Sequence, residues 1–190
     1  MLAGEDITIA KAGVPLIDLK IHEVKRPQFG FMKGLIVVPE GYNIDEDSEF
    51  DLAAFLWRRG TFDLILLDSN ALVWFVTGDK RLGRAAKNLL AGPRPVYFSP
   101  FSVAELELKR LRGRLELPAV FGTALIAGGL SELPLKSEDL LEANKFQTLL
   151  NQDPFDRLLL CQASHHNLRF MTTDLKLLEL EADWIIDATE

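Results

Sequence analysis

Residues 63–76 read "DLILLDSNALVWFV". Four apolar residues, Leu64 to Leu67, lead directly into Asp68, and an apolar pattern resumes two residues later. A short apolar run of this kind is typical of a strand that is covered on both faces. In an open parallel sheet, ligands bind at the carboxyl ends of the strands. Asp68 is therefore a candidate functional residue.

Strand-like and helix-like stretches alternate from residue 62 onward. This alternation predicts parallel strands joined by right-handed crossovers, in a three-layer α/β/α sandwich with a central parallel sheet. The expected strands are "LILLD" (64–68), "PVYFSP" (95–100), "LSELPL" (130–135), "LRFMTTD" (168–174) and "DWIIDA" (183–188). Helices are expected between them, among them 102–115, 119–129, 137–150, 153–167 and 174–180.

The first part of the chain has a different pattern. "DITIA" (6–10) and "PLIDLKI" (15–21) predict a small hairpin, followed by an irregular stretch. An amphipathic helix is expected from Ser48, as its N-cap, to Gly60. We therefore expect two units, an extended segment at 1–60 and an α/β domain at 61–190.

Composition limits the classes of function. The net charge is −7, so the sequence lacks the basic surface of a protein that binds nucleic acid by charge alone. Bound metal cations could supply that positive field instead. The single cysteine, the absence of a signal peptide and the lack of a long apolar run lead us to expect a cytoplasmic protein without a membrane span.

Four acidic residues occur at strand ends or helix starts: Asp68, Glu105, Asp156 and Asp174. Because such positions share one edge of a parallel sheet, we expect these four side chains to converge. Each also has a simpler interpretation: Asp156 and Asp174 as part of a helix cap, Asp68 in an Asx turn onto Asn70, and Glu105 in a capping box with Ser102 at the start of the helix expected at 102–115. Both interpretations stay open for any single acid.

Several carboxylates held close together raise one another's pKa unless a cation compensates them. Oxygen ligands without cysteine or a well-placed histidine favour Mg²⁺ or Mn²⁺ over zinc. Such an ion can activate water for attack on a phosphodiester. We interpret His165 and His166, at the end of a helix, as solvent-facing residues or as partners of the helix dipole at its C-terminus.

Four blocks of this sequence, "LLDSNALVWF", "SPFSVAELELKRLRGRLELP", "DPFDRLLLCQA" and "MTTDLKL", resemble the signature blocks of PIN-domain ribonucleases of the VapC toxin type. The resemblance implies a PIN-like fold and Mg²⁺-dependent endoribonuclease activity on tRNA or rRNA, with dimerisation. It assigns metal binding and catalysis to Asp68, Glu105, Asp156 and Asp174. It assigns supporting roles to Ser69, Asn70, Asp153 and Thr172.

The N-terminal stretch "AGEDITIAKAGVPLIDLK" is similar to the middle of a Phd/YefM-type (VapB) antitoxin, and residues 31–56 resemble the tail that wraps the toxin. The strand and helix that complete the antitoxin's DNA-binding fold do not precede it, so DNA binding is not expected. The resemblance implies that this fused segment inhibits the nuclease, in cis or in a swapped dimer. A basic side chain from it would block the acids, the candidates being Lys25, Arg26, Lys33, Arg58 and Arg59.

Two other interpretations are compatible with the same residues. A PIN-like fold without catalysis could act only as a protein-binding module. Alternatively, the same acids could serve a metal-dependent phosphatase or a DNA nuclease.

Overall fold

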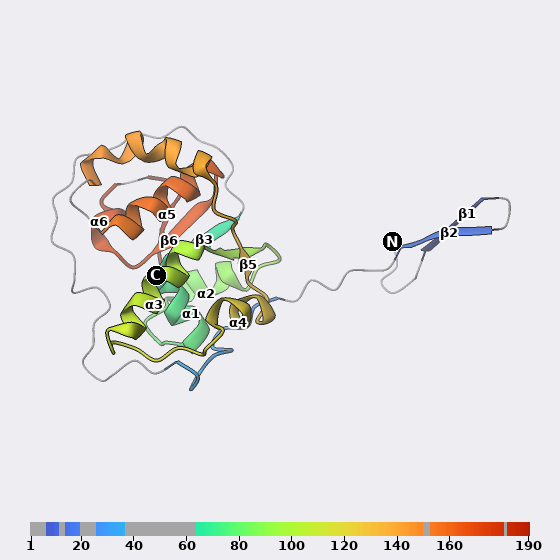
Figure 1. The fold of residues 1–190 in the computed structure, drawn as a ribbon, viewed down its shortest axis with the longest axis horizontal. Helices are drawn as coiled ribbons and strands as arrows, with labels where there is room; N and C mark the ends of the chain where they lie inside the picture. Colours follow the sequence, from blue (N-terminus) through green and yellow to red (C-terminus); the bar gives the residue numbers. More distant parts are fainter. Residues whose placement is uncertain (1–6, 12–13, 20–25, 37–63, 150–152, 181) are drawn as a thin grey trace.

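The computed structural model describes residues 7–11, 14–19, 26–36, 64–149, 153–180 and 182–190 (Figure 1). The expected helix at 48–60 and the junction after it lie outside these residues. No helix within the described ranges is long and apolar enough to cross a membrane. The elements are β1 (Ile7–Lys11), β2 (Val14–Leu19), β3 (Ile65–Leu67), α1 (Ser69–Thr77), α2 (Arg84–Leu90), β4 (Val96–Phe98), α3 (Pro100–Leu111), α4 (Phe121–Ala127), β5 (Ser131–Glu132), the 3₁₀ segment η1 (Ser137–Leu149), α5 (Pro154–His165), β6 (Arg169–Thr172), α6 (Leu175–Leu178) and β7 (Ile185–Asp187).

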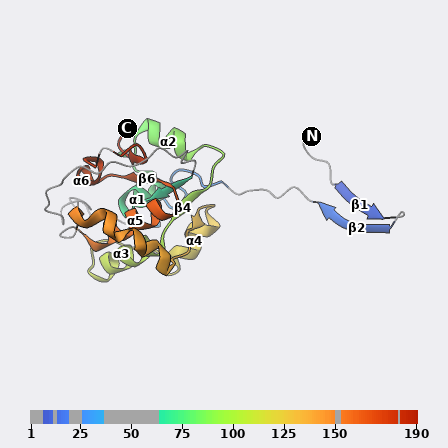
Figure 2. The ribbon, with the colours of Figure 1, turned by 90° about the horizontal axis from the view of Figure 1, so that it is seen from above.

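Five strands form a parallel sheet in the order β5-β4-β3-β6-β7, and helices cover both of its faces (Figures 1 and 2). Strand β3 lies at the centre, where Ile65 pairs with Val96 of β4 and with Arg169 of β6. All five strands are therefore joined through crossovers, as the alternating pattern predicts. The predicted three-layer fold is confirmed.

The apolar run of β3 serves both faces of the sheet. Ile65 and Leu67 belong to a core cluster with α1, α2 and α4, whereas Leu66 packs with α5, η1 and α6. All three side chains are buried. Because successive strand residues point to opposite faces, a strand covered on both sides must be apolar throughout.

The start of α3 differs from the sequence prediction. Its N-cap is Ser99, whose hydroxyl accepts a hydrogen bond from the Phe101 amide at 3.1 Å, and Pro100 occupies the first helical position. Ser102 is therefore inside the helix, and the capping box predicted with Glu105 is wrong. Proline at the first helical position is the local signal that favours the earlier start.

The stretch predicted as a helix at 137–150 is instead a 3₁₀ segment with a break. Phe146 has φ −112° and ψ 36°, outside the helical region. Its ring is buried and contacts Trp184 edge-on, with the centroids 6.4 Å apart. Burial of this ring accompanies the interruption of the regular helix.

The expected N-terminal hairpin is present. Strands β1 and β2 pair antiparallel, with Ile7 opposite Leu19, and the register shifts between Ile9 and Ala10.

Residues 26–36 are bonded to the end of α1. The Gly30 amide donates to the Phe75 carbonyl at 2.8 Å, and the Met32 amide donates to the Val76 carbonyl at 2.7 Å. The last carbonyls of a helix have no partner within it. This segment therefore caps α1 from a distant part of the chain.

Side chains of the same segment enter the core. Met32 and Ile36 are buried in the cluster that includes α1. The Phe29 ring lies against the Phe75 ring and beneath the Lys87 ammonium, which is 4.8 Å from its centroid. Residues 26–36 are thus part of the packed domain.

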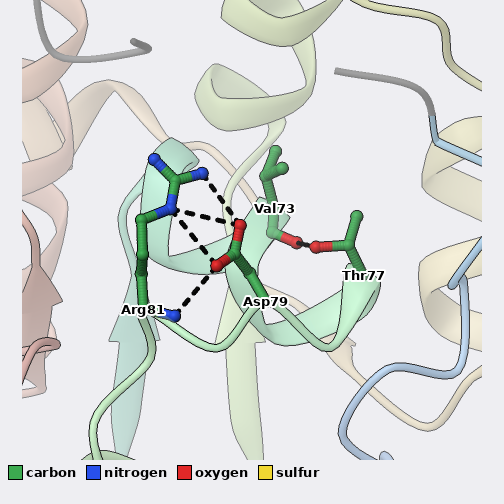
Figure 3. A network of polar contacts seen from close by, with 4 residues as sticks. All are labelled: Val73, Thr77, Asp79 and Arg81. Carbon is green, nitrogen blue, oxygen red and sulfur yellow. Dashed lines mark hydrogen bonds and ion pairs between the residues drawn. The ribbon is translucent and has the colours of Figure 1, made fainter. Parts of the chain in front are cut away.

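Polar contacts fix the same end of α1 from the other side (Figure 3). The Thr77 hydroxyl donates to the Val73 carbonyl at 2.7 Å. The Arg81 guanidinium donates hydrogen bonds to both carboxylate oxygens of Asp79. These contacts hold the turn after the helix in place.

Two glycines make the close approach of residues 26–36 to α1 possible. Gly30 has φ +77° and Gly78, which ends α1, has φ +71°, a region that favours glycine. A Cβ on Gly30 would lie 3.1 Å from the Gly78 Cα. Gly34 has a similar φ of +83° but meets nothing within 4 Å.

We predict that Gly30→Ala lowers the free energy of unfolding by about 1–3 kcal/mol more than Gly34→Ala does. Both variants strain the backbone, but only the first also forces α1 and the segment apart. Urea denaturation measures the difference. Equal losses for the two variants would show that the contact contributes nothing.

Candidate active site

Asp68 occupies the end of the central strand. Only 4% of its surface is exposed, and it is the N-cap of α1. One carboxylate oxygen accepts from the Ala71 amide at 2.5 Å, and the other accepts from the Thr173 amide, beyond β6, at 3.0 Å. Asp68 therefore caps a helix and also joins two neighbouring strand ends.

Burial raises the pKa of Asp68 to about 7. Hydrogen bonds from Thr172, Ala71 and Thr173 oppose this rise, and the negative charge of Glu105 adds to it. Hydrogen-bond donors to both oxygens favour the ionised carboxylate, so its pKa does not rise above the neutral range despite burial.

Glu105 projects from α3 toward α1. The Ser69 hydroxyl donates to its Oε2 at 2.5 Å, and the Lys109 ammonium lies 2.7 Å from its Oε1. Both members of this ion pair are nearly buried. Lys109 is absent from the residues predicted from sequence, although its i,i+4 spacing from Glu105 is a readable signal.

Asp156 lies in the first turn of α5, whose N-cap is Asp153. Burial is the largest cause that raises the pKa of Asp156 well above its ordinary value. The charges of Glu105, Asp68, Asp153 and Asp174 raise it further, in that order. The structure therefore places the other three predicted acids, with Asp153, within electrostatic reach of Asp156.

Asp174 caps α6, and its carboxylate accepts from the Lys176 amide at 2.8 Å. Its own amide donates to the Thr172 hydroxyl at 3.0 Å. The side-chain amide of Asn70 donates to the Thr173 hydroxyl at 3.3 Å. The residues assigned supporting roles, Ser69, Asn70, Asp153 and Thr172, thus all contact or neighbour the acids.

The basic candidates from the N-terminal segment have a different placement. Arg26 and Lys33 are exposed and belong to the segment bonded to the last turn of α1, whereas Asp68 is at its first turn. Lys25, Arg58 and Arg59 lie outside the described residues. Among the described residues, Lys109 is a basic side chain that does pair with an acid of the site, Glu105.

The donor set fits a hard divalent cation. Every donor is an oxygen, and Asp156 carries the repulsion of four other carboxylates, which a dication would relieve. Within the described ranges, only Asp139, His165 and His166 bring three ligand atoms within 4.8 Å of one another. No three of the four acids meet that spacing, so an ion shared by all four would be held partly through water molecules.

We predict that the metal-free protein loses stability as pH rises from about 4 to about 7. The pKa of Asp68 is higher in the folded state, about 7 against 3.8, so folding favours the protonated carboxyl. Its contribution is present below pH 4 and lost as pH passes 7, by up to about 4 kcal/mol.

Urea unfolding in EDTA, compared with Asp68→Asn, isolates this contribution. The asparagine changes the hydrogen bonding by an amount that does not vary with pH. The quantity to compare is therefore the slope of the free energy of unfolding against pH. A slope that is the same in both proteins would contradict the shift.

The PIN domain family model matches residues 65–182. Similar solved structures include VapBC2 from Rickettsia felis bound to a DNA fragment from their promoter, with 15% identity, a TM-score of 0.48 and coverage of 65% of this chain and 96% of that one. A toxin–antitoxin complex from Klebsiella pneumoniae has 15% identity, a TM-score of 0.46 and coverage of 66% and 98%. FitAB bound to the IR36 DNA fragment has 17% identity, a TM-score of 0.42 and coverage of 66% and 99%.

A search among curated proteins finds no match to the sequence. The family model spans more than half of the chain, including β3 with Asp68 and the helices that carry Glu105 and Asp156. The chain belongs to the PIN domain family.

Proposed function

We propose that this protein is a metal-dependent endoribonuclease, the toxin of a type II toxin–antitoxin system, that cleaves RNA phosphodiester bonds with Mg²⁺ or Mn²⁺. The observation that supports the proposal is that Glu105, Asp68 and Asp174 lie close enough to Asp156 for their charges to add to the rise in its pKa that burial causes. PIN domains are typically metal-dependent nucleases, and this chain has the acids that such chemistry requires.

A divalent ion at this site would activate a water molecule and neutralise the charge that develops on the phosphate. The residues of this chain prepare the site for it. Backbone amides hold Asp68 in one orientation, Ser69 fixes one oxygen of Glu105, and Lys109 balances part of the negative charge. Fixed donors of this kind need no rearrangement when the reaction occurs.

The proposed substrate is RNA of the tRNA or rRNA class, in the cytoplasm. The net charge of −7 disfavours binding through a basic surface, so the metal would supply much of the attraction to phosphate. We further propose that residues 1–60 are an antitoxin-like segment joined to a nuclease domain at 61–190, and that the protein forms a dimer in which this segment can be exchanged.

We predict that Asp68→Asn, Glu105→Gln, Asp156→Asn and Asp174→Asn each lower RNA cleavage by more than about 100-fold, because each removes a charge that holds the metal. Glu107→Gln is the matched control. It lies on the same helix as Glu105 but pairs with Arg110 at the surface, so it should cleave normally.

Cleavage of RNA, DNA and a phosphomonoester by the same preparations, with Mn²⁺ titrated calorimetrically, checks this prediction. Preference for DNA or for the monoester would replace the ribonuclease with a DNA nuclease or a phosphatase. Wild-type protein that binds no Mn²⁺ and cleaves nothing would indicate a PIN fold that acts only in protein association.

We also propose that a basic side chain of the N-terminal segment restrains the nuclease. The candidates remain Lys25, Arg26, Lys33, Arg58 and Arg59. Deletion of residues 1–60 is a poor test, because it also removes Met32 and Ile36 from the core and the cap from α1. Single substitutions leave those contacts in place.

We predict that alanine at one of these five positions raises RNA cleavage at least about 10-fold, because the site loses a cation that competes with the metal. Arg112→Ala, an exposed change at the end of α3, is the control. Five variants with wild-type rates, and wild-type stability in urea, would rule out inhibition through these side chains.

A further inference from the structure

Three metal-ligating side chains lie together at the far end of α5. His165 is the last residue of this helix, His166 is its C-cap, and Asp139 is in the first turn of η1. The His166 Nε2 is 2.9 Å from an oxygen of Asp139, and one ligand atom from each residue lies within 4.8 Å of the other two. The expected exposure of His165 is observed, but His166 is held by an acid.

This cluster is separate from the acids of the PIN site. Asp156 is in the first turn of α5 and His166 follows its last turn. Ten residues of helix span about 15 Å. One ion cannot bridge that distance, so the two ends of α5 must be considered independently.

Asp139 is fixed before any ligand arrives. Its side chain is fully buried, and its second oxygen accepts from the Lys136 amide at 3.0 Å. A second carboxylate, Glu142, accepts a hydrogen bond from the Ser164 hydroxyl at 2.8 Å and lies close enough to His165 to interact with it electrostatically. The histidines therefore face acids that are already held in position.

The chemistry of these ligands differs from that of the PIN site. Two imidazoles with one carboxylate suit Zn²⁺ and related transition metals, whereas Mg²⁺ prefers oxygen ligands. Cys161, one turn earlier on α5, is a poor ligand because burial raises the pKa of its thiol to about 11. The cluster thus offers nitrogen and oxygen donors only.

His165 is the chain neighbour of His166, and its ring meets the His166 ring edge-on with the centroids 5.1 Å apart. Ligands about 2.1 Å from a tetrahedral ion lie about 3.4 Å apart. The observed 2.9 Å is therefore about half an ångström from that spacing. His165 is exposed and His166 partly so, which leaves a path from solvent.

We propose that Asp139, His165 and His166 form a Zn²⁺ site that ties η1 to the end of α5. Water completes the coordination. An ion bound only by the folded protein also stabilises it, in proportion to the logarithm of the ion concentration above its dissociation constant.

Titration of the untagged, full-length protein with Zn²⁺ tests this, in excess Mg²⁺ so that oxygen sites are filled. We expect one Zn²⁺ per chain, a thermal stability that rises with Zn²⁺, and visible absorption bands when Co²⁺ replaces it. His165→Ala should lower the affinity by more than about 100-fold. Because this residue is exposed, the variant keeps the contact between His166 and Asp139 and should fold.

Two controls separate this site from others. His22→Ala changes the remaining histidine of the chain, and Asp68→Asn changes the PIN site. Both variants should bind Zn²⁺ like the wild type. Asp68→Asn should lose RNA cleavage, but Zn²⁺ binding is measured separately, so that loss does not affect this test. No Zn²⁺ binding by the wild type, or equal binding by His165→Ala, would overturn the proposal.

Discussion

A carboxylate buried at the end of the central strand loses its hydration and needs hydrogen bonds or a cation in its place. The residues around Asp68 supply such hydrogen bonds. The amides of Ala71 and Thr173 reach its two oxygens, which ties the start of α1 to the end of β6. The helix cap and the junction between strands are therefore one interaction. The apolar run of β3 places the charge there, because burial of that run on both faces leaves the strand end at the middle of the sheet edge.

Capping and metal binding are compatible roles for these acids. Asp68, Asp153 and Asp174 each cap a helix through an amide, and a carboxylate has lone pairs left for a cation. Capping also fixes the direction of each carboxylate. Burial raises the pKa of Asp156, and repulsion from the other acids raises it further, so a bound cation would also stabilise the folded protein.

The sequence carries much of this site locally, because strand ends and helix starts have short signals. Asp68 and Asp156 were predictable from an apolar run and from the "DPFD" cap. Glu105 was predicted from its place near the start of a helix that follows a strand, and the competing interpretation as half of a capping box is wrong, since Pro100 starts α3 earlier. The contact of residues 26–36 with α1 was not predictable in this way. It depends on which distant amides meet the last carbonyls of the helix, and no local pattern encodes that choice.

The central claim is that the four carboxylates share a divalent ion. Anomalous scattering from a crystal of the protein grown with Mn²⁺ tests it most directly, because it locates the metal without relying on activity. The account predicts a peak among Asp68, Glu105, Asp156 and Asp174, with at least one carboxylate oxygen about 2.2 Å away. A crystal with no peak there, or with manganese only beside Asp139 and the two histidines, would contradict it.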